Sequence, residues 1–175
     1  MTGWSLVPVV AATLLLSACS PPIDLGAGET ETCVPSSMYR HVVAGYPFDN
    51  DTPGPVTITA LGYEGLVGAS VDNAWMVPID REDDGTLGYG VEPFETVGQG
   101  HDRWVDRVDA IGAVVASGNE SMLVLELRAD DEEAGLAALN VEYSIDGLLY
   151  RTTSNNAVIF ASGGDDACTR QPVEE

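Results

Sequence analysis

The chain contains no lysine, so its seven basic residues are all arginines, set against 28 acidic residues. The resulting formal net charge is −21. A surface with this charge is repelled by phosphate backbones and by anionic lipid headgroups. The composition therefore argues against nucleic acid binding and against docking of the folded domain onto a membrane surface.

The sequence also lacks the motifs of common nucleophilic enzymes. It has no Gly-x-Ser-x-Gly segment, and only His41 and His101 could serve a Ser-His-Asp triad. With 28 acidic residues, close carboxylate pairs are unavoidable and do not indicate a glycosidase. We therefore predict that the protein is not an enzyme and needs no cofactor.

The hydrophobic segment near the amino terminus is too short to span a bilayer. It begins near Ser5 and holds about a dozen apolar residues, whereas a membrane-spanning helix needs about 20. It ends in Leu16-Ser17-Ala18-Cys19, and Pro21 and Pro22 would stop a helix from continuing past the cysteine. The segment therefore has the length of a signal peptide.

The four residues from Leu16 to Cys19 resemble the lipobox of bacterial lipoproteins. The resemblance implies cleavage after residue 18, a lipid on the Cys19 thiol and a location on the extracytoplasmic face of the cell membrane. Two acyl chains would give stable anchoring. The segment departs from the family's pattern because Met1 to Ser5 contains no lysine or arginine. The alternatives are an ordinary secretory signal and an uncleaved membrane segment.

Lipidation of Cys19 would leave Cys33 and Cys168 as the remaining cysteines. In an oxidising compartment we expect these two residues to form a disulfide, with two free thiols as the alternative. The bond would close a loop of about 135 residues and stabilise the fold by at most about 5 kcal/mol.

These features divide the chain into four parts. Residues 1–18 are the predicted signal peptide, and residues 19–32 are the lipidated cysteine and a flexible tether rich in proline, glycine and acid. Residues 33–168 form one domain, and residues 169–175 form a disordered tail.

Five segments of the domain have the composition of β-strands, with β-branched and apolar residues bounded by turn residues. They are 55–61, 74–79, 108–115, 121–128 and 157–161. In the fourth, Leu123, Leu125 and Leu127 alternate with other residues, which places three leucines on one face toward the core. We predict an all-β fold, an antiparallel β-sandwich of immunoglobulin-like kind, with a small β-barrel as the alternative.

The dipeptide Asp146-Gly147 predicts a type I′ turn in a hairpin over 139–153. Counting outward from this turn pairs Tyr143 with Tyr150 on the inner face. The same count pairs Glu142 with Arg151 on the solvent face.

Met38, His41 and His101 are the candidate metal ligands, as a thioether and two imidazoles suited to copper. The acidic loop 80–85 begins like a calcium loop, but Val91 occupies the position that needs a bidentate glutamate. For both, the alternative is a purely structural role.

Aromatic side chains could line a groove that stacks on sugar rings. They are Trp75, Trp104, Tyr39, Tyr46, Tyr63 and Tyr89. The leading hypothesis is a non-catalytic interaction or structural module at the cell envelope, held in the membrane by the lipid on Cys19. Its partner would be an envelope protein or glycan and not a nucleic acid. The alternative is a lipoprotein that binds copper or a small ligand.

Overall fold

The computed structural model describes residues 22–25, 30–79, 91–97, 102–162 and 168. In this part of the chain strands dominate, and the single 3₁₀ helix is η2 (Asp102–Asp106). The strands are β1 (Glu31–Pro35), β2 (His41–Asp49), β3 (Val56–Glu64), β4 (Ala69–Pro78), β5 (Val91–Pro93), β6 (Val108–Asp109), β7 (Val114–Val115), β8 (Glu120–Ala129), β9 (Ala134–Leu136), β10 (Ala138–Ile145), β11 (Leu148–Ser154) and β12 (Ala157–Ala161).

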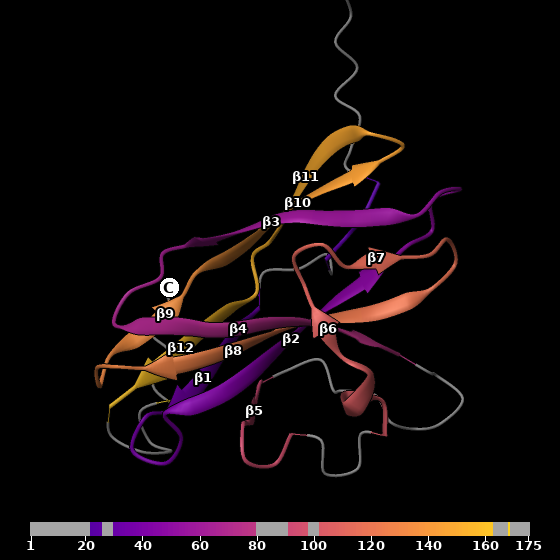
Figure 1. Ribbon diagram of the computed structural model, residues 1–175. Helices are drawn as coiled ribbons and strands as arrows, with labels where there is room; N and C mark the ends of the chain where they lie inside the picture. The colour runs from indigo at the N-terminus through magenta and orange to yellow at the C-terminus, as the bar shows by residue number, and fades with distance from the viewer. Residues whose placement is uncertain (1–21, 26–29, 80–90, 98–101, 163–167, 169–175) are drawn as a thin grey trace, which may run out of the picture.

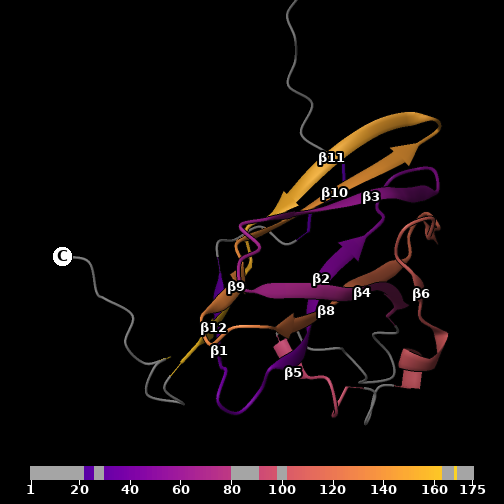
Figure 2. The ribbon, with the colours of Figure 1, turned by 60° about the vertical axis from the view of Figure 1, so that its left-hand side comes forward.

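The strands form three sheets (Figure 1). A four-stranded sheet has the order β11-β10-β3-β7, a five-stranded sheet the order β5-β2-β8-β4-β6, and a three-stranded sheet the order β1-β12-β9. Figure 2 shows the first two as layers, with the third at one end of both. Among the described strands, only β1 and β12 pair in parallel. The all-β sandwich is confirmed and the closed barrel is wrong, while the immunoglobulin-like connection stays a prediction.

The core lies between the two larger sheets. Leu123, Leu125 and Leu127 of β8 are at most 1% exposed, as their alternation predicts. They belong to the same buried cluster as Ile58 of β3 and Tyr143 of β10. The face of β8 that carries the leucines is therefore the inner face of the five-stranded sheet.

The hairpin of β10 and β11 has the predicted register. Tyr143 pairs with Tyr150, and Glu142 pairs with Arg151, whose guanidinium lies 3.2 Å from the glutamate carboxylate. Asp146 and Gly147 both have positive φ, at 50° and 80°, as a type I′ turn requires.

The other strand predictions are confirmed except one. The segment 157–161 is β12, and the segments 55–61, 74–79 and 121–128 fall almost wholly in the longer strands β3, β4 and β8. The segment 108–115 is wrong as a single strand, because β6 pairs in the five-stranded sheet and β7 in the four-stranded sheet. Gly112, with φ of 89°, lies in the turn between them.

Strand β2 lies between β5 and β8 in the five-stranded sheet, yet its sequence contains Gly45 and Pro47, which usually weaken a strand. Pro47 is tolerated here because β5 pairs only with Val42 to Ala44. On that side Pro47 has no described strand neighbour that would need its missing N–H group.

Part of the segment predicted as a tether over 19–32 packs against the domain. Ile23 and Leu25 are fully buried, and the Ile23 N–H donates a hydrogen bond of 3.1 Å to the Tyr143 hydroxyl. Burial of these two apolar side chains stabilises the packed position of this segment relative to a solvated one. Cys33 on β1 forms the predicted disulfide with Cys168, with their Cα atoms 5.5 Å apart.

Candidate functional site

The outer face of the five-stranded sheet is also covered. Val43, Val77, Met122 and Val124 form a second, smaller buried cluster on it. The partly buried side chains packed against this cluster are Trp75, Ile79, Phe94, Val97 and Trp104. All but Trp75 follow β4 in the chain, and we call these four residues the covering segment. From Ser121 to Leu127, both faces of β8 are therefore shielded from water.

Glu126 is the next residue on this outer face of β8 after Met122 and Val124. Its residue surface is only 5% exposed, which is unusual for a carboxylate without partners. His41 Nε2 lies 2.5 Å from Glu126 Oε1, and the Asn73 amide donates a hydrogen bond of 2.7 Å to Glu126 Oε2. Both oxygens of the buried carboxylate therefore have partners, as such burial requires.

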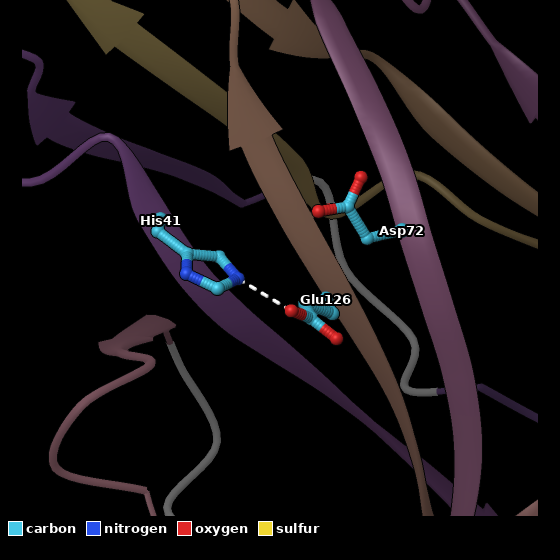
Figure 3. A group of neighbouring side chains, drawn as sticks. All are labelled: His41, Asp72 and Glu126. Atoms are coloured by element: carbon cyan, nitrogen blue, oxygen red, sulfur yellow. Dashed lines mark hydrogen bonds and ion pairs between the residues drawn. The ribbon is translucent and has the colours of Figure 1, made fainter.

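His41 reaches this carboxylate from the neighbouring strand β2 (Figure 3). Its ring stacks on Phe94 with 4.1 Å between ring centroids. The Phe94 N–H also donates a hydrogen bond of 3.0 Å to the His41 carbonyl. The imidazole is thus held between the covering segment and Glu126, which restricts its rotamer.

A β-bulge in β4 supplies the third member of the group. Val71 pairs with Leu127 and Asn73 with Glu126, so Asp72 is the extra residue on β4. Bulges re-aim side chains in this way and are frequent beside functional sites. Here the bulge lets Asp72 and Asn73 both reach outer-face side chains of β8, although they are consecutive residues.

Arg128, two residues after Glu126, binds the bulged aspartate. Its Nε donates a hydrogen bond of 2.7 Å to Asp72 Oδ2, and its Nη2 lies 2.6 Å from the same oxygen. The hydrogen bond with Asp72 raises the pKa of Arg128. The other oxygen, Asp72 Oδ1, accepts only a long hydrogen bond of 3.3 Å from Ser70 among the described contacts.

Ligand-type atoms of His41, Asp72 and Glu126 all lie within 4.8 Å of one another, a group that we call the three-strand cluster. In the described part of the chain, this is the one such group of three or more histidine, cysteine, aspartate or glutamate side chains. One imidazole and two carboxylates can share protons through hydrogen bonds or bind a cation.

The cluster contains one of the three metal ligands predicted from the sequence. Met38 is 56% exposed and lines a shallow pocket with Arg40 and Glu132. His101 and the acidic loop 80–85 lie outside the described residues, as does Cys19. Sequence reasoning missed Glu126 and Asp72, although a lone glutamate inside the apolar run 121–128 is a signal that could have found the first.

The aromatic residues proposed for a sugar groove are divided between different parts of the fold. Tyr46 is buried in the inner core, where burial raises its pKa. Trp75 and Trp104 contact each other edge to face at 5.3 Å, and the Arg107 guanidinium lies over both rings. These three residues stabilise the covering segment through aromatic and cation–π contacts.

No protein-family model matches this chain, and no curated protein matches it in sequence. Among the described residues, no helix is long and apolar enough to cross a membrane.

Proposed function

We propose that this protein is a lipid-anchored, extracytoplasmic lipoprotein whose β-sandwich acts as a non-catalytic interaction and structural module at the cell envelope. The observation that carries the proposal is the pairing of the cysteines. Cys33 and Cys168 are bonded to each other, so Cys19 at the end of the lipobox-like sequence is the one cysteine outside the pair.

The position of Ile23 supports a short connection between lipid and domain. Ile23 is fully buried and bonded to Tyr143, only four residues after Cys19. Four residues span at most about 14 Å. The anchored domain would therefore stand close to the bilayer, with the end near Tyr143 toward it and the acidic surface limiting closer adsorption.

The connection that runs from η2 through β6 to β7 supports a contact role. Val105, Val108, Ile111 and Val114 are each more than half exposed, within ten residues of chain. Exposed aliphatic side chains close together in sequence favour association with another surface where they form a patch. We propose this connection as the contact region for an envelope protein, with a glycan as the alternative partner.

Intact-mass analysis of the protein purified from the cell envelope tests the anchor. We expect loss of residues 1–18 and an added diacylglyceryl mass, and release of the Cys19→Ser variant from the membrane fraction. Retention of residues 1–18 without acyl mass would overturn the proposal.

Site-specific photo-crosslinking in intact cells tests the contact region. A photoreactive residue at Ile111 should give a discrete protein adduct, whereas one at exposed Leu149 on β11 should not. A peptidoglycan adduct at Ile111 would favour the glycan. Equal adducts at both positions, or none at Ile111, would contradict a specific contact region.

A further inference from the structure

We propose that the three-strand cluster of His41, Asp72 and Glu126 binds one divalent transition-metal ion, with zinc as the ion that its ligands suit best. The proposal is independent of lipid attachment, because it depends only on side chains of the folded sandwich.

The three ligands come from neighbouring strands of one rigid sheet. His41 is on β2, Glu126 on β8 and Asp72 on β4, and these strands pair side by side. Two ligand atoms on a tetrahedral zinc ion stand about 3.4 Å apart, since each bond is about 2.1 Å long. The 2.5 Å contact between His41 and Glu126 would open by about 0.9 Å, and Asp72 would approach the ion with Oδ1 while Oδ2 stays on Arg128.

The ligands are already held from behind, as in built metal sites. Asn73 holds Glu126 through Oε2 and leaves Oε1 toward His41. Arg128 holds Asp72 through Oδ2 and leaves Oδ1 with only the weak Ser70 contact. Each carboxylate therefore has one oxygen fixed by a donor and a second oxygen that can serve the ion.

Burial and access are divided in a way that suits a metal with an open position. The side chain of Glu126 is 7% exposed, whereas that of Asp72 is 29% exposed. Low exposure at the centre strengthens the attraction between carboxylate and cation. The more exposed aspartate gives water access to the fourth position that zinc keeps in addition to three protein ligands.

The chemistry of the ligands selects among ions. An imidazole favours zinc, copper, nickel and iron, while carboxylates favour harder ions such as magnesium, calcium and manganese. One imidazole with two carboxylates is a ligand set that suits zinc, whereas the thioether of Met38 predicted from the sequence suits copper. The imidazole also disfavours magnesium and calcium, because these ions take oxygen ligands.

The competing interpretation is a closed polar network. In that case His41 and Glu126 serve only to hold Phe94 against the sheet, and the three side chains of the cluster would bind no ion. The two interpretations differ in whether zinc binds to these particular side chains.

Calorimetric titration of zinc chloride into the chelator-treated full chain in detergent separates them. We expect one zinc per chain, and affinity lowered by about tenfold to 100-fold in each of His41→Ala, Asp72→Asn and Glu126→Gln. Glu142→Gln is the matched control, because Glu142 is also a carboxylate paired with an arginine, but it is exposed and lies on the four-stranded sheet, away from the cluster. It should bind zinc as the wild type does, and excess magnesium should not displace the ion.

The melting temperature of each variant without zinc, compared with the wild type, identifies any variant that has lost its fold. Asp72→Asn keeps the test decisive, because it alters an exposed side chain and leaves the Glu126 contacts intact. Failure of the folded wild type to bind zinc would overturn the proposal. Binding that survives all three ligand changes would also overturn it, because the acidic surface would then hold the ion.

Discussion

The two faces of β8 differ in what they bury. The inner face presents Leu123, Leu125 and Leu127 to the main core, where hydrophobic side chains predominate. The outer face begins in the same way with Met122 and Val124, but then buries Glu126. The inner face therefore holds the sandwich together, while the outer face combines a small apolar cluster with a polar group.

The outer face can hold polar groups because, among the described residues, its edge is open near Asp72. Beyond β4, the strand β6 pairs only with Trp75 and Met76, so the bulge at Asp72 lies where β4 has no further described neighbour. Solvent can reach Asp72 there, whereas the inner face is enclosed by the four-stranded sheet. A binding site that needs access from solvent can therefore form on the outer face but not on the inner face.

The largest effect should come from truncating each face in turn. Leu125→Ala should lower the free energy of unfolding by about 3–5 kcal/mol, because it leaves a cavity in the enclosed core. Met122→Ala should cost about 2 kcal/mol, because the covering segment can collapse onto the smaller cluster. Urea unfolding followed by tryptophan fluorescence measures both, and equal losses would remove the distinction between the faces.

Removing the buried carboxylate should have the next largest effect. Glu126→Ala leaves His41 and Asn73 without their shared acceptor and should cost about 1–3 kcal/mol. Glu142→Ala, which breaks an exposed ion pair, should cost less than about 1 kcal/mol. A Glu126→Ala variant as stable as Glu142→Ala would mean that the outer-face group is not a tightly held structure.

Alkaline pH should act mainly through the inner face. Burial raises the pKa of Tyr46, and it also raises the pKa of Tyr143. A raised pKa in the folded state means that stability is full below about pH 10 and falls as pH rises further, by at most about 1.4 kcal/mol per pH unit for each tyrosine. Tyr46→Phe should make this fall less steep in unfolding experiments between neutral and alkaline pH. An unchanged slope would contradict the assignment.

The smallest effect should come from a site on neither face of β8. Arg151→Ala breaks the Glu142 pair on the solvent side of the hairpin and should cost at most about 1 kcal/mol. Thermal unfolding at low and high salt measures it. A loss larger than that of Glu126→Ala would reverse the ranking of surface and outer-face contacts.

The parts of the fold set by local chemistry could be predicted from the sequence. Asp146-Gly147 determined the hairpin register, and alternation identified the leucine face of β8. Strand β2 could not be recognised, because Gly45 and Pro47 are tolerated only where pairing with β5 has ended. Ile23 was assigned to a tether because its burial depends on a distant partner, Tyr143.

The three-strand cluster was predictable only in part. His41 was identified by residue type, but its partners lie 31 and 85 residues away in sequence, at Asp72 and Glu126. Their approach depends on the order of β2, β8 and β4 and on the bulge in β4. Such long-range pairing is a property of the assembled sheet and leaves little local signal.

Anomalous diffraction from crystals of the zinc-loaded protein tests the central claim, that the outer face carries a metal site, most directly. We expect one anomalous peak at about 2.0–2.2 Å from His41 Nε2 and from one carboxylate oxygen each of Glu126 and Asp72. A zinc peak on other side chains would contradict the metal site, as would a cluster that keeps the direct contact of His41 with Glu126 and holds no zinc.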